Sequence, residues 1–130
     1  MLNCMTYALD IEDQCLEDID SFLYSRFPEK AIQEKCKKFG RNCRLLKSDN
    51  DELYDGEWVI AFYGFIPTHR DYEGLPDQWD YHFMRKVADI WIHRPYIGAT
   101  EIAVVPEETR KAFISEGYPP KFFAISKVEE

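Results

Sequence analysis

The chain has 130 residues, a length that predicts one domain, residues 1–130, able to bury a core without stabilising cross-links. Its 24 acidic and 16 basic residues give a formal net charge of −8, which argues against a nucleic-acid binder because such a protein needs a basic face. No segment approaches the roughly 18 consecutive apolar residues of a membrane span, and the N-terminus lacks the pattern of a secretory signal. We therefore expect a cytoplasmic protein with no membrane association.

The first third of the chain predicts helices. The segment CMTYALD follows Asn3, a good N-cap residue, and predicts a short helix that carries Cys4. In residues 11–27 apolar side chains recur at helical spacing, and acidic residues near the start suit a helix N-terminus. A further helix is predicted for PEKAIQEKCKKFG, beginning at Pro28 and closed by Gly40.

The rest of the chain predicts mainly strands. They correspond to the segments NCRLLKS, WVIAFYGF, DYHFMR, DIWIHRP and KFFAISKV. The nearly unbroken apolar run WVIAFYGF is typical of a strand buried on both faces. Before the last strand, VPEETRKAFISEG predicts a helix with Pro106 at its start and Gly117 at its end. Helices first and an antiparallel sheet afterwards indicate an α+β domain.

Charge is distributed unevenly along the chain. Residues 10–20 contain six acids and no base, whereas residues 30–47 contain seven Lys or Arg and one acid, Glu34. Such segregation is typical of solvated helix faces of opposite sign. The alternative is a docking surface for a protein partner of complementary charge.

Four cysteines lie at positions 4, 15, 36 and 43, without a Cys-x-x-Cys pair. A reducing compartment disfavours disulfides, and a zinc site normally includes one close pair of ligands. Cys15 and Cys36 fall on the apolar faces of predicted helices, which favours buried packing residues. We expect no cofactor and no metal, and a site built from Cys36, Cys43 and a histidine is the alternative.

The spacing of His82 and His93 has a geometric meaning in a hairpin. If residues 86–89 form a four-residue turn, Arg85 pairs with Ile90 and His82 faces His93. Directly opposed residues have Cβ atoms about 5 Å apart, so the two imidazoles could share a hydrogen bond. One histidine could then act as a base while the other fixes its tautomer and orientation. The alternative is two unrelated histidines, one packed and one exposed.

Cys4 stands at the start of a predicted helix, where the dipole and the free N–H groups stabilise a thiolate. Together with a histidinium partner, such placement moves a cysteine pKa from about 8.5 into the range of roughly 3.5–7.5. The same N–H groups can hold a developing oxyanion. A cysteine at a helix N-terminus, packed against a sheet that presents an oriented histidine, is the working arrangement of papain-like enzymes.

Three sequence blocks resemble the NlpC-type branch of the papain-like cysteine hydrolases, in particular small bacterial and phage proteins. The blocks are NCMTYAL at residues 3–9, DYHFMR at 80–85 and WIHRP at 91–95. In that branch the cysteine comes first and two strand histidines follow about a dozen positions apart. Met5 and Met84 replace aromatic residues of the pattern, and neither replacement touches a reactive atom.

The resemblance implies a papain-like fold, in which N-terminal helices carrying the cysteine pack on an antiparallel sheet. It implies Cys4 as nucleophile, His82 as general base and acid, and His93 as the orienting residue, with Asn3 capping the helix. The substrate would be a peptide, an amide or an ester, handled through a thioester acyl-enzyme. Water would resolve the thioester in an amidase or peptidase, and another nucleophile would do so in a thiol acyltransferase.

Two other functions stay open at this point. The first is a non-catalytic interaction or inhibitor module on a papain-like scaffold, which the segregated charge and the aromatic residues Trp79 and Tyr81 would suit. The second is a metal site in which Cys4, His82 and His93 supply three ligands, although the expected facing of the strands offers no fourth.

Overall fold

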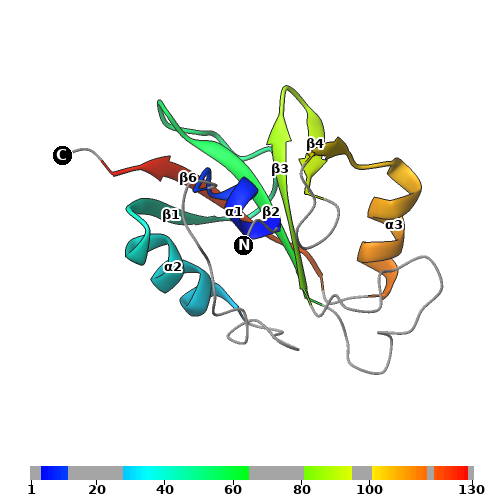
Figure 1. Ribbon diagram of the computed structural model, residues 1–130, viewed down its shortest axis with the longest axis horizontal. Coiled ribbons are helices and arrows are strands. Elements are labelled where there is room, and N and C mark those ends of the chain that lie inside the picture. The colour runs from blue at the N-terminus through cyan, green and yellow to red at the C-terminus, as the bar shows by residue number, and fades with distance from the viewer. Residues whose placement is uncertain (1–3, 12–27, 65–80, 95–100, 117–118, 129–130) are drawn as a thin grey trace.

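The computed structural model of the chain describes residues 4–11, 28–64, 81–94, 101–116 and 119–128 (Figure 1). These residues form α1 (Cys4–Ala8), α2 (Glu29–Lys38), β1 (Arg41–Leu46), β2 (Trp58–Gly64), β3 (Tyr81–Val87), β4 (Ile90–His93), β5 (Ala103–Val104), α3 (Glu107–Glu116) and β6 (Lys121–Lys127). The predicted α+β class is confirmed, and every strand predicted from the sequence is present. The two-residue strand β5 was not predicted.

The strands form one six-stranded sheet in the order β1-β6-β2-β3-β4-β5. All neighbouring strands are antiparallel, as the sequence predicts. The last strand of the chain, β6, lies between β1 and β2, so β2 is an interior strand with β6 on one side and β3 on the other. The register of β2 and β3 places Phe62 opposite Phe83 and Tyr63 opposite His82.

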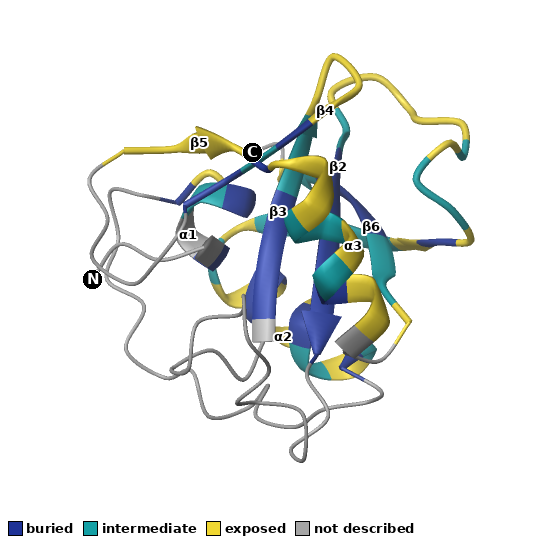
Figure 2. Cartoon of the chain, turned by 90° about the vertical axis from the view of Figure 1, so that its right-hand side faces the viewer, coloured by how far each residue is buried: buried dark blue, intermediate teal, exposed yellow. Residues whose placement is uncertain are grey.

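A hydrophobic core lies on each face of the sheet (Figure 2). On one face α1 and α2 pack on side chains that include Phe62 and Phe83. On the other face α3 packs, through Phe113, on side chains that include Tyr63 and Met84. Since successive strand residues point to opposite faces, this double cover explains why the whole of β2 from Val59 onward is buried, as predicted.

Helix α2 ends before Gly40, as the sequence predicts, and charged residues near its ends suit the helix dipole. Glu29 lies in its first turn and Lys35, Lys37 and Lys38 in its last, the arrangement that the helix dipole favours. Gly40 follows with a φ of 73°, the left-handed conformation that commonly ends a helix. Cys36 is fully buried in the core beneath the helix, which confirms its predicted packing role.

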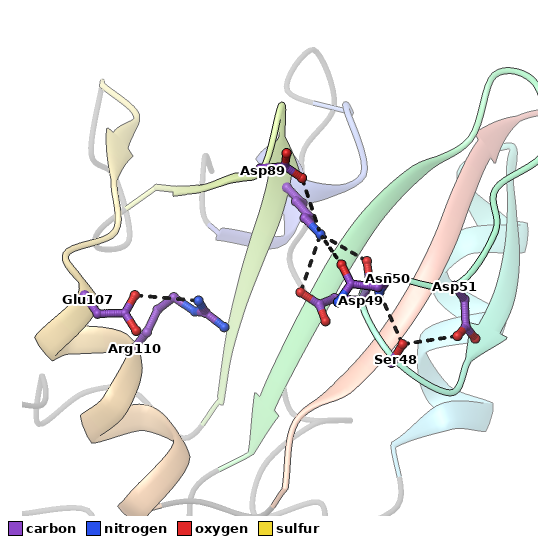
Figure 3. Close-up of polar contacts among 8 residues, drawn as sticks. Ser48, Asp49, Asn50, Asp51, Asp89, Glu107 and Arg110 are labelled. Atoms are coloured by element: carbon purple, nitrogen blue, oxygen red, sulfur yellow. Dashed lines mark hydrogen bonds and ion pairs between the residues drawn. The ribbon is translucent and has the colours of Figure 1, made fainter.

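A polar turn after β1 is tied to β3 by the Lys86 side chain. Lys86 Nζ donates to the backbone oxygen of Asp49 at 3.1 Å and to Asn50 Oδ1 at 3.3 Å. Within the turn, the Ser48 hydroxyl donates to Asp51 Oδ1 at 3.1 Å (Figure 3). These bonds fix the connection between β1 and β2 against the β3–β4 hairpin.

Several predicted features lie outside the described residues. Residues 12–27 of the helix expected over 11–27 are among them, with Cys15, and so is Gly117, the expected end of the last helix. Asn3 and Trp79 also lie outside them. Among the described helices, none is long and apolar enough to cross a membrane.

Candidate active site

The β3–β4 hairpin turns over two residues, Ala88 and Asp89, rather than the four predicted. Both have positive φ, 48° and 67°, as the central residues of a type I′ hairpin turn do. Val87 therefore pairs with Ile90, and Arg85 pairs with Ile92. The predicted pairing of Arg85 with Ile90 and of His82 with His93 is wrong by two residues.

The predicted contact between the two histidines is nevertheless present. Continued along the strands, the observed register places His93 opposite Met84, diagonal to His82 on the same face. Diagonal neighbours are within reach of long side chains, and His82 Nε2 lies 2.7 Å from His93 Nδ1. The rings meet edge to face, at 84° with centroids 4.9 Å apart. A shift of two residues preserves the face of a strand, whereas a shift of one would have separated the pair.

Helix α3 covers the histidine pair from the side away from α1. The Phe113 ring stacks on the His82 ring, with centroids 5.1 Å apart and planes 10° from parallel. Phe113 also contacts Tyr63, the residue paired with His82 across β2 and β3, at 5.6 Å between centroids. Sequence reasoning missed Phe113, although it is the one aromatic residue of the predicted helix.

Burial controls the protonation of the pair. His82 has no exposed surface, and His93 is 5% exposed. Burial, and to a lesser degree the charge of His93, hold the pKa of His82 well below 6.5. Burial lowers the pKa of His93 to about 4. Both imidazoles are therefore neutral at pH 7, and one donates the shared hydrogen bond to the other.

The helix that begins at Cys4 is held to the sheet through its C-terminal carbonyl groups. Trp58 Nε1 donates to the Ala8 oxygen at 2.8 Å, and Arg41 Nε donates to the Leu9 oxygen at 2.8 Å. Arg41 Nη2 also donates to the Asp10 oxygen at 2.6 Å. Side-chain donors from β1 and β2 thus satisfy carbonyl groups that a helix end leaves open, and they fix the end of α1 to the sheet.

The structure brings together two of the three predicted site residues. Met5, Ala8 and Leu9 of α1 belong to the core on one face of the sheet, whereas His82 contacts Phe113 on the other face. Helix α1 contacts both β3 and β4. The described pairing between these two strands ends with Arg85 and Ile92, so it does not extend to His82 or His93. The Cys4 side chain lies outside the described part of the chain.

Cys36 and Cys43 pack against each other between α2 and β1. Cys36 is buried and Cys43 half-buried. The Cys43 thiol donates a hydrogen bond to the Cys36 side chain, and this bond and then burial raise the pKa of Cys43. Among the described residues, no group of three or more His, Cys, Asp or Glu side chains lies in position to hold a metal ion.

Comparison of the chain with models of protein families, with curated proteins and with solved structures gave no match. The chemical features of the candidate site are those of its own residues. They provide a buried imidazole whose Nε2 is engaged by a second imidazole, a stacked aromatic ring and a nearby helix that begins with a cysteine.

Proposed function

We propose that this chain is a thiol amidase or peptidase in which Cys4 is the nucleophile, His82 the general base and acid, and His93 the orienting residue. The observation that carries the proposal is the contact of 2.7 Å between His82 Nε2 and His93 Nδ1. A base held in one orientation by a third polar group is what nucleophilic catalysis by cysteine requires. The scaffold we propose is papain-like, with α1 packed on the antiparallel sheet.

This contact supports a division of roles between the two ring nitrogens of His82. Because Nε2 faces His93, Nδ1 is the nitrogen that would take the proton of the thiol. Nδ1 of neutral His82 can accept a proton only if the ring hydrogen is on Nε2. This Nε2–H then donates a hydrogen bond to His93 Nδ1, so the ring hydrogen of neutral His93 is on its own Nε2. When His82 becomes an imidazolium, this hydrogen bond becomes charge-assisted and stronger.

The reaction follows from this arrangement. The Cys4 sulfur attacks the carbonyl carbon of an amide, peptide or ester while its proton passes to His82. His82 then gives that proton to the departing amine or alcohol, which leaves a thioester on Cys4. Water activated by His82 hydrolyses the thioester, releases the acid and restores the thiol. An amine or alcohol in place of water would make the same chain an acyltransferase.

The proposal sets a geometric requirement on α1. The buried side chains of α1 and the His82 ring belong to opposite faces of the sheet. The Cys4 thiol therefore has to reach His82 Nδ1 at the end of the sheet where the described pairing of β3 with β4 has stopped. The last pair described there joins Arg85 to Ile92. The contacts of α1 with both β3 and β4 support this requirement.

A second candidate is a non-catalytic interaction module, and one observation favours it. His82 is fully buried beneath Phe113, so a pair of neutral histidines can serve as core packing. In that case Cys4 has no base and reacts as an ordinary thiol. The module would then bind a protein partner through its charged surface.

The experiment that separates the two candidates is labelling with an electrophilic thiol probe, read by intact mass and peptide mapping. The wild type should take up one label at Cys4 within minutes, and Cys4→Ala should take up none on that timescale. Cys43→Ser is the matched control and should label like the wild type. A protein that labels slowly at all accessible cysteines, unchanged by His82→Ala, would contradict the catalytic proposal and support the interaction module.

A further inference from the structure

Arg85 contacts two aromatic rings on the face of the sheet opposite His82. Its guanidinium carbon lies 4.6 Å from the centre of the Trp58 ring and 5.7 Å from that of Tyr7. Such contacts fix the plane of a guanidinium while its N–H donors point outward in that plane. Arg85 is thus pre-oriented to donate hydrogen bonds.

Arg44 shows how this protein completes a stacked arginine. Its guanidinium lies 4.2 Å from the centre of the Tyr54 ring. Glu57 accepts from both ends of the fork, with Oε1 2.7 Å from Nη2 and Oε2 3.2 Å from Nε. The carboxylate and the guanidinium therefore form a bidentate pair beside an aromatic ring.

Arg110 repeats the arrangement more loosely. Its guanidinium lies 5.3 Å from the centre of the Trp91 ring, and its Nη1 lies 3.8 Å from Glu107 Oε2 (Figure 3). Arg85 has the aromatic part of the same arrangement, but it forms no ion pair with any carboxylate among the described residues. Its Nε is buried and has no hydrogen-bond acceptor within the described part of the chain.

Arg85 lines a groove of about 780 Å³. The other lining side chains include Asn42, Asp55, Trp58 and Ser126. Asp10 and Lys127 also line it, and they pair with each other at 3.3 Å between Oδ2 and Nζ. Among the residues that the structure describes, the groove therefore offers one cation without a carboxylate partner, on an aromatic wall, with room for a small organic molecule.

We infer that this groove binds a ligand bearing a single carboxylate, which Arg85 holds through two parallel N–H···O bonds. A planar carboxylate matches the guanidinium fork, as Glu57 does at Arg44. With Asp10 paired to Lys127, Asp55 adds one negative charge to the groove, which disfavours a dianion such as phosphate relative to a monoanion. Tyr7, whose ring contacts Arg85, belongs to the helix that begins at Cys4. Arg85 would therefore favour acyl substrates that carry a carboxylate, a step that rests on the proposed function.

The test is an NMR titration of the Cys4→Ala chain with acetylglycine, and with acetylglycinamide as the uncharged match. The Nε–H signal of Arg85 should shift and saturate with acetylglycine and stay in place with the amide, while that of Arg44 stays in place with both. Arg85→Lys keeps the charge but loses the fork, so the affinity should fall about tenfold or more. Arg44→Lys is the matched control and should leave the affinity unchanged.

Equal shifts with the amide, equal affinity for inorganic phosphate, or an unmoved Arg85 signal would each overturn the inference. Because the titration uses a chain without the Cys4 thiol, its outcome is independent of any turnover. Loss of the proposed hydrolase chemistry and loss of this binding site are thus distinguished.

Discussion

His82 and His93 meet diagonally across a hairpin, with His82 Nε2 2.7 Å from His93 Nδ1, although neither residue is paired with the other in the sheet. The contact depends on a face that both strands share and on rings long enough to span the diagonal. In the proposed function, the nitrogen of His82 that takes the proton of the thiol is therefore Nδ1, because Nε2 faces His93.

The first prediction concerns the acceptor that His93 provides. His93→Asn retains a carbonyl oxygen able to accept from His82 Nε2, whereas His93→Leu has no acceptor. We expect the rate of Cys4 labelling to fall less than about tenfold in His93→Asn and by roughly 10²-fold in His93→Leu. Labelling kinetics at pH 7, with the mass of the Cys4 peptide as readout, measure both.

Unfolding by urea provides the control for that pair of variants. If His93→Asn and His93→Leu slow labelling equally while both stay folded, His93 does not act as a hydrogen-bond acceptor for the base.

The second prediction is a loss of stability in mild acid. The unfolded pKa of His93 is 6.5 and the folded pKa is about 4, so above pH 6.5 neither state binds a proton there. Between pH 6.5 and 4 the unfolded chain binds a proton that the folded chain excludes, so the free energy of unfolding decreases as the pH is lowered. The fall should be on the order of 2 kcal/mol by pH 4.5, at about 1.4 kcal/mol per pKa unit. His82, whose pKa is also lowered, adds a loss of the same sign.

Urea unfolding at pH 7.5 and at pH 5 measures this loss. Asp51 and Glu57 also have lowered pKa values, but from 3.8 and 4.5, so their loss of stability comes mainly at lower pH. His93→Asn should lose less stability than the wild type between the two pH values. Identical losses would show that the folded pKa of His93 is near its ordinary value.

The third prediction concerns the helix above the pair. Phe113→Leu removes the ring that stacks on His82 and leaves a gap in a closely packed core, so it should destabilise by roughly 1–3 kcal/mol. Ile114, the next residue, is 45% exposed, and Ile114→Ala should change the free energy of unfolding by less than about 1 kcal/mol. Thermal or urea unfolding distinguishes the two. Equal effects would mean that α3 does not pack through Phe113.

Much of this fold could be predicted from local patterns, because those patterns report burial. The apolar run of β2 indicates two covered faces, and the structure covers it with α1 and α2 on one side and α3 on the other. Gly40 and the lysines before it likewise mark the end of α2. The position of β6 between β1 and β2 could not be predicted, since residues separated by about 80 positions decide it and no local signal encodes that pairing.

The candidate site shows the same division. The contact between His82 and His93 followed from their spacing, because the observed register differs from the predicted one by only two residues and so keeps them diagonal neighbours on one face. The register itself was wrong, because Ala88 and Asp89 do not form the Asn-Gly or Asp-Gly pair that marks a two-residue turn. The stacking of Phe113 depends on how α3 packs, which no spacing within that helix reveals.

The last prediction follows from that turn. Ala88 has a φ of 48° and Asp89 a φ of 67°, a conformation that Gly adopts freely, Asn and Asp tolerate, and Ala adopts only at a steric cost. Replacement by Asn at 88 and Gly at 89 supplies the residues that a type I′ turn favours. We expect a gain of roughly 1 kcal/mol in the free energy of unfolding, measured with urea, and an unchanged His82–His93 contact. Ala88→Pro is the matched opposite, because proline fixes φ near −65° and should destabilise the hairpin. If the Asn-Gly variant is less stable than the wild type, the hairpin does not turn at these two residues.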